Sequence, residues 1–475
     1  MIAHRSVVLA LTLVLSLASR PAAADPGGKV FVSNDNDAGP GSFREAIRQA
    51  NANPAITQVQ FLGRVRTIEL RQTVEFIGAQ ELSLHGNNAT LDGTNIPSGE
   101  AFLVTGGGDL AVAHLTVRNA PAEGITVEVP GTATGTVSVS LFHVAILGNR
   151  GHGVLVNDQV DSTTQEGVQP NPNGSDASVT VSVVNTRFVG NGFSVSDRDG
   201  LRVNEGGPGD LSIAVKLSLA HGNAADGIEV DERGSGDVRV DMFGTRISEN
   251  GVFDPADLDD GFDIDEYNEG SVIGAIVLSA AVDNFEEGFD VNENNAGDLL
   301  VNMLYVDASG NREEGIDYEE DDDFAGGGNL VTAMYGIRAN GNGADGGDAG
   351  LKIREKGDGE LNATVNRVET SNNLIGGISI REDAVGSLVS AIARATSVGN
   401  AGHGIDFDEN RLNTSDAGNL AASVADSTSS TNAGAGVRAD QQTPGVGALL
   451  LTNATLAGNT GGATTGGGVT VTIVP

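Results

Sequence analysis

A short phrase that recurs at regular intervals constrains the fold of this chain more than any other feature. The phrase reads glycine, then alternating apolar and other residues, then glutamate, as in residues 261–266, GFDIDE. Successive copies are mostly 27 residues apart, and they begin at Gly200, Gly227, Gly261, Gly288, Gly315, Gly350, Gly377 and Gly404. Alternation is typical of a strand with one buried face, and a fixed return indicates stacked copies of one unit.

Two further markers recur in these units. A Gly-polar-apolar triplet follows the phrase glycine by nine residues, as in Gly236-Asp237-Val238, and an asparagine often precedes the phrase glycine by four residues, as Asn223 does. We therefore expect an all-β fold, a single right-handed parallel β-helix (solenoid) of about 27-residue rungs, a rung being one turn of the solenoid. We expect the asparagines to form a ladder of turn hydrogen bonds with a structural role.

One helix is predicted near the start of the chain. Ser42 and Glu45 have the spacing of a capping box, with Ser42 capping the helix and Glu45 reaching back to it. Apolar residues follow at helical spacing, and Asn53-Pro54 ends the pattern. We expect this short N-terminal helix to cap the open end of the solenoid core.

Part of this region resembles a known family. Residues 41–47 (GSFREAI), residues 68–70 (IEL) and residues 90–93 (TLDG) are similar to the N-terminal region of exported bacterial right-handed β-helix repeat proteins, which have a pectate-lyase-like superfamily architecture. Phe43 stands where leucine is usual in that family. The resemblance implies a right-handed parallel β-helix and export. It implies no single activity, because surface proteins and polysaccharide-degrading enzymes share the architecture.

The sequence predicts three segments. Residues 1–24 are expected to be a signal peptide, because an apolar stretch follows Arg5 and three alanines precede Asp25. Residues 25–104 should hold the N-terminal cap and the first rungs, and residues 105–475 the β-helix repeats, which are most regular at 200–411. We expect a secreted or cell-envelope protein without a membrane span, and the absence of cysteine excludes disulfides.

The net charge of the chain limits the kinds of partner that it can bind. With 27 Lys+Arg against 64 Asp+Glu, the net charge is −37. This charge opposes nucleic acid and anionic membranes as partners, and it suits cations. The chain has no Trp and 4 Tyr, which disfavours sugar recognition by aromatic stacking but leaves calcium-bridged binding of an acidic polysaccharide or a cell-surface component open. The oligomeric state is left undetermined.

The glutamate that ends each phrase poses an electrostatic problem. Two bare carboxylates about 5 Å apart repel each other by roughly 3 kcal/mol at an effective dielectric constant near 20. Three remedies are open: hydrogen bonds from turn N–H groups, bound cations such as a column of Ca²⁺, or raised pKa values. The residues concerned are Glu205, Glu232, Glu266, Glu293, Glu320, Glu355, Glu382 and Glu409.

Outward-facing phrase positions add an acidic strip over four rungs. We expect a cation site there, with Ca²⁺ as the candidate cofactor, because calcium takes six to eight oxygen ligands and tolerates irregular carboxylate geometry. A solvated acidic face without any ion is the alternative. The candidate metal ligands are Glu229, Asp231, Asp263, Asp265, Asp290, Asp317 and Glu319.

Two classes of function remain open. The first is a secreted or cell-surface scaffold for extracellular interaction, stabilised by calcium and binding acidic glycans. The alternative is a polysaccharide lyase or glycoside hydrolase, with Asp259, Asp260 and Asp263 as paired carboxylates. In a lyase, Lys352, Arg354 and Arg381 would assist calcium-dependent elimination from an acidic sugar. The Gly-His-Gly triplets at 151–153 and 402–404 resemble those of pectin hydrolases, although the repeat itself supplies the last glycine of each. The scaffold is the expectation, and catalysis is left undecided.

Overall fold

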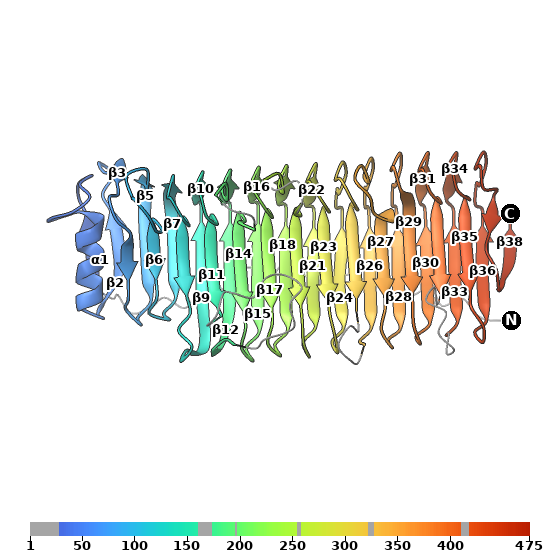
Figure 1. Ribbon diagram of the computed structural model, residues 1–475, viewed down its shortest axis with the longest axis horizontal. Helices are drawn as coiled ribbons and strands as arrows, with labels where there is room; N and C mark the ends of the chain where they lie inside the picture. Colours follow the sequence, from blue (N-terminus) through green and yellow to red (C-terminus); the bar gives the residue numbers. More distant parts are fainter. Residues whose placement is uncertain (1–27, 160–172, 195–196, 254–257, 322–326, 410–417) are drawn as a thin grey trace.

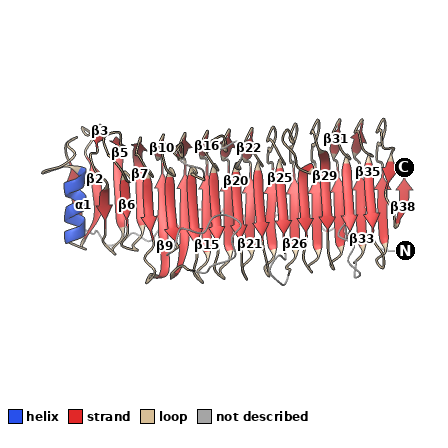
Figure 2. Ribbon diagram, in the orientation of Figure 1, coloured by secondary structure: helices blue, strands red, loops and turns tan. Residues whose placement is uncertain are grey.

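The computed structural model describes residues 28–159, 173–194, 197–253, 258–321, 327–409 and 418–475. The predicted signal peptide lies outside the described residues, and so do parts of the longest insertions between phrases. The described chain forms an elongated parallel solenoid, with its one described helix at the N-terminal end and the C-terminus at the other (Figure 1). Strands make up nearly all of its regular structure (Figure 2).

The phrases all lie in a 14-stranded parallel sheet, which we call the phrase sheet. Leu201 pairs with Ile228, 27 residues later, and Ile228 pairs with Phe262, because an insertion lengthens that step. The predicted solenoid and its 27-residue period are therefore confirmed. The strands are β4 (Val74–Phe76), β6 (Phe102–Val104), β8 (Ile125–Glu128), β11 (Val154–Asp158), β14 (Leu201–Glu205), β17 (Ile228–Glu232), β20 (Phe262–Glu266), β23 (Phe289–Glu293), β25 (Ile316–Glu320), β27 (Ala349–Glu355), β29 (Gly376–Glu382), β32 (Ile405–Glu409), β35 (Val437–Gln441) and β37 (Thr464–Thr465).

A 22-stranded sheet forms the opposite wall and the upper corner of the solenoid. Two further strands, β31 (Thr396–Val398) and β34 (Thr428–Ser430), pair with each other. The strands of the large sheet are β1 (Gly28–Val32), β2 (Ile56–Phe61), β3 (Thr67–Glu69), β5 (Leu82–Asp92), β7 (Leu110–Arg118), β9 (Thr134–Phe142), β10 (Ala145–Leu147), β12 (Asp176–Val184), β13 (Arg187–Val189), β15 (Leu211–Lys216), β16 (Leu219–His221), β18 (Val238–Phe243), β19 (Arg246–Ser248), β21 (Val272–Val277), β22 (Ala280–Val282), β24 (Leu299–Leu304), β26 (Leu330–Tyr335), β28 (Leu361–Asn366), β30 (Leu388–Ala393), β33 (Leu420–Ala425), β36 (Gly447–Thr452) and β38 (Val469–Val474).

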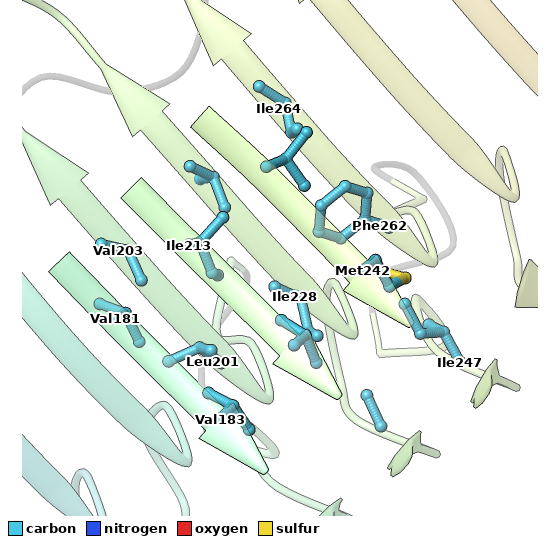
Figure 3. Close-up of a cluster of buried hydrophobic side chains, with 14 of the residues drawn as sticks. Val181, Val183, Leu201, Val203, Ile213, Ile228, Met242, Ile247, Phe262 and Ile264 are labelled. Atoms are coloured by element: carbon cyan, nitrogen blue, oxygen red, sulfur yellow. The ribbon is translucent and has the colours of Figure 1, made fainter. Parts of the chain in front are cut away.

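The core lies between the two sheets and runs the length of the solenoid. Figure 3 shows Leu201 and Ile228 of the phrase sheet beside Val183 and Ile213 of the opposite sheet. These side chains are buried, as the alternation of the phrase predicts. Each contributes about 1.5–3 kcal/mol to stability, so the core grows with each added rung.

The helix α1 (Phe43–Ala52) caps the N-terminal end as predicted. Its buried face consists of Phe43, Ala46, Ile47 and Ala50. The capping box forms only in part. Ser42 Oγ accepts the backbone N–H of Glu45 at 3.2 Å, whereas the Glu45 carboxylate binds Arg48. The backbone N–H of Ser42 is already bonded to the carbonyl of Gly39, so Glu45 has no donor to reach back to.

The asparagine ladder is confirmed, and it is longer than the sequence marker indicates. In most rungs the side-chain oxygen of one asparagine accepts both the backbone N–H and the side-chain N–H of the asparagine before it, as Asn223 does from Asn191 at 3.1 and 3.0 Å. Asn191, Asn250 and Asn342 belong to the ladder although they do not stand four residues before a phrase glycine. Insertions separate them from that glycine.

Candidate functional site

Charged side chains are concentrated along the outer face and one corner of the phrase sheet. At the corner, the residue before the phrase glycine is an acid in five rungs, and these corner acids are Asp199, Asp226, Asp260, Glu287 and Glu314. Asp199 accepts the backbone N–H of Asp226 at 3.1 Å, and Asp260 accepts that of Glu287 at 2.6 Å. Each corner acid in these pairs therefore caps the next rung, a role that sequence reasoning missed.

The two Gly-His-Gly triplets occupy the same corner. Nδ1 of His152 accepts the backbone N–H of Asp199 at 3.0 Å, and Nδ1 of His403 accepts that of Ala435 at 2.9 Å. Each histidine thus accepts a backbone N–H of the next rung, as the corner acids Asp199 and Asp260 do. The triplets have a structural explanation, and their likeness to a hydrolase motif carries no functional weight.

Corner acids and outward-facing acids meet to form what we call the acidic cluster: Asp226, Glu229, Asp260, Asp263 and Asp290. One oxygen from each of Asp226, Glu229 and Asp263 lies within 4.8 Å of the other two. The same holds for Asp260, Asp263 and Asp290, so Asp263 belongs to both groups of three. The register explains this, because Glu229, Asp263 and Asp290 are paired neighbours on β17, β20 and β23.

Asp263 is the most constrained member of the acidic cluster. Its side chain belongs to a residue that is only 8% exposed, and its Oδ1 is buried without a hydrogen-bond partner. Burial raises the pKa of Asp263 well above its usual range, and the neighbouring Asp265 and Asp290 raise it further. Burial likewise raises the pKa of Asp290 to about 7, and the charge of Asp265 adds to the shift. A shared proton or a bound cation would relieve the repulsion among these carboxyls.

The donor set of the acidic cluster fits a hard divalent cation. All five side chains offer carboxylate oxygens, which Ca²⁺ prefers and binds in one- or two-oxygen modes. Of the seven predicted metal ligands, the structure brings together Glu229, Asp263 and Asp290, and it adds the corner acids Asp226 and Asp260. Sequence reasoning paired Asp260 with Asp263 only as candidate catalytic carboxylates, and it did not include the corner acids among the metal ligands because the corner position precedes the phrase.

The other four predicted ligands have partners of their own. Asp231 is ion-paired with Arg202 at 2.9 Å and Arg233 at 3.0 Å, and Asp265 accepts the hydroxyl of Tyr267 at 2.6 Å. Asp317 and Glu319 both pair with Lys352, at 2.6 and 2.5 Å. None of the four belongs to a group of three carboxylates among the described residues.

The predicted catalytic residues fall into two separate places. Asp259, Asp260 and Asp263 lie at or beside the acidic cluster. Lys352 and Arg354 are on β27, three strands from Asp263 on β20, which corresponds to about 14 Å at the usual strand spacing. Arg354 is paired with Asp383 at 2.5 Å, and Arg381 with Asp348 at 2.5 Å. The acids and the bases are therefore not brought together around one point.

A cavity of about 270 Å³, which we call the polar pocket, opens on the phrase sheet next to the acidic cluster. The rungs nearer the N-terminus supply the acids Glu100, Glu123 and Glu128, and Asp197 and Asp231 also line the pocket. Later residues supply its guanidinium groups, Arg198, Arg202 and Arg233. Sequence reasoning missed this pocket, because Glu100, Glu123 and Glu128 come from rungs that carry no complete phrase.

The arginines of the polar pocket differ in how they are paired. Arg202 is 7% exposed and is ion-paired with Asp197 at 2.5 Å, Glu229 at 2.6 Å and Asp231 at 2.9 Å. Nη1 of Arg198 instead lies 3.2 Å from Nε2 of His152 and donates to the backbone carbonyl of Asp197 at 2.9 Å. Within the described part of the chain Arg198 forms no ion pair, so its charge is available to an anionic ligand.

Glu128 is the acid of the polar pocket with a distinct environment. Burial raises the pKa of Glu128, and the nearby carboxylates of Glu100 and Glu123 raise it further. Asn157 acts in the opposite direction, since its side-chain amide donates to Glu128 at 2.8 Å. A carboxyl that retains its proton more readily than usual is suited to donate a hydrogen bond or a proton to a bound sugar.

Comparison with known proteins yields likeness in structure only. No family model matches the sequence, and no curated protein matches it. Among solved structures, the pectate lyase Pel9A is 17% identical, with 68% of this chain and 77% of that chain covered at a TM-score of 0.38. The chain is a parallel β-helix protein. The strand pairing described above establishes this fold on its own.

Two other solved structures show the same kind of likeness. The Azotobacter vinelandii mannuronan C-5 epimerase AlgE6 A-module is 13% identical over 90% of this chain and 94% of that chain, with a TM-score of 0.34. The Streptococcus pneumoniae surface protein and adhesin PfbA is 9% identical over 91% of this chain and 95% of that chain, with a TM-score of 0.22. These likenesses concern the β-helix and carry no argument about function.

Proposed function

We propose that this β-helix protein is an extracellular scaffold that binds a divalent cation at the acidic cluster and an acidic glycan on the adjoining phrase sheet. The observation that carries the proposal is Asp263, a buried carboxylate with an unpartnered oxygen between two groups of three acids. Burying such a charge is costly unless it is compensated, and no basic side chain is paired with Asp263 among the described residues.

Calcium is the cation that this donor set suits best. Asp226, Glu229, Asp260, Asp263 and Asp290 would hold it, and a bound Ca²⁺ would neutralise the cluster and offer a remaining position to an anionic ligand. The protein's own contribution is to fix these carboxylates, because the corner acids are tied to backbone N–H groups and the others to β-strands.

The polar pocket supports an acidic glycan as the partner. Arg198, free of ion pairs among the described residues, suits the carboxylate of a uronic acid, and Asn157, Asn204 and Glu128 offer groups for sugar hydroxyls. The rest of the phrase sheet is too acidic to attract a polyanion unless cations bind first. We therefore expect glycan binding to depend on the divalent cation.

The predicted signal peptide supports an extracellular location. None of the helices in the described residues is long and apolar enough to cross a membrane.

The second candidate function is a polysaccharide lyase or glycoside hydrolase. The raised pKa of Glu128 in a pocket that also holds Glu100 and Glu123 favours it, because paired carboxylates with different pKa values are what glycoside hydrolysis needs. In this alternative Glu128 would act as the acid. The two candidate functions differ in whether a bound polymer is cleaved.

The test is binding of polygalacturonate and of alginate to the protein with excess Ca²⁺ or with a chelator. We expect binding only with Ca²⁺, and at least about tenfold weaker binding for Arg198→Ala, which corresponds to about 1.4 kcal/mol. Arg239→Ala is the matched control, because Arg239 is an exposed arginine on β18 of the opposite sheet. Equal binding by Arg198→Ala and the control would refute the assigned glycan site.

Product assays on the same mixtures decide between the two functions. New unsaturated sugar ends, which absorb in the ultraviolet, would replace the scaffold by a lyase. New reducing ends without unsaturation would indicate a hydrolase, and Glu128→Gln should then abolish their formation.

A further inference from the structure

The glutamates that end the phrases form a buried column along the solenoid. Glu205, Glu232, Glu266, Glu293, Glu320, Glu355, Glu382 and Glu409, which we call the glutamate ladder, all have 0% exposure. They are paired in register from strand to strand, as Glu232 is with Glu266 and Glu355 is with Glu382. Neighbouring strands are about 4.8 Å apart, so these carboxyls are closely spaced over eight rungs.

Turn hydrogen bonds satisfy one oxygen of most ladder glutamates. Backbone N–H groups of the following turn donate to Glu205 from Gly207 at 3.0 Å and to Glu293 from Gly297 at 3.0 Å. Similar bonds reach Glu232, Glu266, Glu320, Glu355 and Glu382. The hypothesis that turn N–H groups compensate the ladder is thus confirmed for this first oxygen.

The second oxygen of each ladder glutamate has no such donor. The buried atoms without a hydrogen-bond partner include Oε1 of Glu205 and Glu409 and Oε2 of Glu232, Glu266, Glu293, Glu320, Glu355 and Glu382. Along the solenoid axis, the group that faces each of these oxygens is the carboxyl group of the next rung. Between two ionised carboxylates there is no hydrogen-bond donor.

No basic side chain is ion-paired with a ladder glutamate among the described residues. The charged groups that act on the ladder from outside it are acids, namely Asp158, Asp321 and Asp383. Arg233 and Lys356 directly follow ladder residues but are ion-paired with Asp231 and with Glu319 and Asp321. No ladder glutamate belongs to a group of three possible metal ligands in the described chain, because a straight column brings carboxyls together only in pairs.

At the C-terminal end of the column, a side-chain amide supplies the hydrogen-bond donor that the other ladder positions lack. Gln441 occupies the next position after Glu409 in the phrase sheet, and its side-chain amide donates to the Glu409 carboxylate. Glutamine has the shape of a protonated glutamic acid and carries a permanent donor in the same place. At the other end, Asp158 accepts the backbone N–H and the hydroxyl of Ser175 at 3.0 and 2.8 Å.

We propose that neighbouring glutamates of the ladder share protons, so that a carboxyl O–H on one rung donates to the carboxylate of the next and the folded solenoid holds protons at neutral pH. Each shared proton turns a repulsive pair of carboxylates into a charge-assisted hydrogen bond. The column then needs no metal. It depends on burial, which keeps water from competing for the protons.

The pKa values of the ladder agree with this arrangement. Burial and the neighbouring glutamates raise the pKa of Glu232 to about 12 and that of Glu355 to about 12. Burial raises the pKa of Glu205, Glu320 and Glu382 only to about 7, because neighbouring carboxyls donate to them. Proton donors and proton acceptors thus occur together along the column.

This ladder makes the stability of the solenoid depend on pH in a defined direction. Folded pKa values above the ordinary glutamate value mean that the folded state binds more protons than the unfolded state. The stabilising contribution is therefore complete in mild acid and is lost as pH rises through about 7 and beyond. The ladder therefore stabilises the fold more in mild acid than in alkali.

Infrared spectroscopy of the folded protein near neutral pH tests the proposal directly, because protonated carboxyl groups have their own carbonyl band. We expect that band in the wild type. It should be weaker in Glu355→Gln and unchanged in Glu360→Gln, the control, because Glu360 is an exposed residue directly after the turn. Between about pH 6 and pH 9 the Tm of Glu355→Gln should fall less than that of the wild type, because glutamine keeps its donor.

Two results would overturn proton sharing. One is a wild-type spectrum without a protonated carboxyl band at neutral pH, which needs no variant. The other is an identical band in Glu355→Gln and the wild type. Glu232→Gln provides a second position for the same comparison if Glu355→Gln does not fold.

Discussion

Asn284 accepts two hydrogen bonds from Asn250 through one side-chain oxygen, from the backbone N–H at 3.2 Å and from the side-chain amide at 3.0 Å. Asn284 in turn donates to Asn311. The insertion between Asn250 and Gly261 leaves this contact intact, so the ladder holds successive rungs in register even where their lengths differ.

Replacement of Asn284 by alanine should destabilise the solenoid. The change leaves the buried backbone N–H of Asn250 and one of its side-chain N–H groups without an acceptor, which costs about 1–3 kcal/mol for each group. Denaturant unfolding should show a lower midpoint. Asn362→Ala, a half-buried position on β28, is the control and should change stability by less than about 0.5 kcal/mol. Equal midpoints for the two variants would contradict a structural role for the ladder.

Arg202→Met should be more damaging than any surface arginine change. Its removal leaves the buried carboxylate of Glu229 without a basic partner among the described residues and leaves Asp231 with Arg233 alone, and breaking such a network costs about 3–5 kcal/mol. Unfolding in urea at neutral pH measures this loss. Arg239→Ala, at an exposed ion pair, should cost about 1 kcal/mol or less.

The loss in Arg202→Met should also shrink as pH falls, because the stranded carboxyls then take up protons. A penalty that is the same in mild acid and at neutral pH would mean that the cost is lost packing rather than uncompensated charge.

Glu319 should show the opposite pH dependence to the glutamate ladder. Burial acts to raise its pKa, but Lys352 and Lys356 outweigh burial and hold it at about 2. A pKa depressed in the folded state gives stability that is present above the ordinary glutamate value and is lost as pH falls toward about 2. Glu319→Gln should therefore lose about 3 kcal/mol at neutral pH, at about 1.4 kcal/mol per pKa unit.

The cost of Glu319→Gln should diminish when unfolding is measured at progressively lower pH. Glu313→Gln is the comparison, since Glu313 is a half-buried acid without a resolved basic partner in the described chain. A loss in Glu319→Gln that does not change with pH would contradict the ion pair with Lys352.

The fold was predictable because it depends on contacts that the repeat itself encodes. Leu201 and Ile228 carry the same phrase position, so one unit determines its pairing with the next. The acidic cluster was only partly predictable. Asp263 and Asp290 are phrase residues, but Asp226 and Asp260 reach them from the preceding corner, and the sequence did not indicate that both corner acids join the two phrase acids.

The polar pocket was not predictable for a related reason. Its walls combine Glu128, from a rung without a complete phrase, with Arg198, from an insertion before β14. The ion pair of Asp231 with Arg202 was not predictable either. Arg202 lies on the preceding rung, and the strand register pairs it with Glu229 rather than with Asp231. The repeat period predicts on which face of the solenoid a charged residue lies. Which charges form ion pairs depends on how far their side chains extend.

The most direct test of the proposed cation site is thermal unfolding of the wild type, Asp263→Asn and Asp358→Asn with excess Ca²⁺ or with a chelator. Asp358 is an exposed acid away from the cluster. We predict that Ca²⁺ raises the Tm of the wild type and of Asp358→Asn, since a ligand at about 100 times its Kd stabilises the folded state by about 2.7 kcal/mol. Asp263→Asn should show little of this increase. A wild type that does not respond to Ca²⁺, or an equal response in Asp263→Asn, would contradict the account.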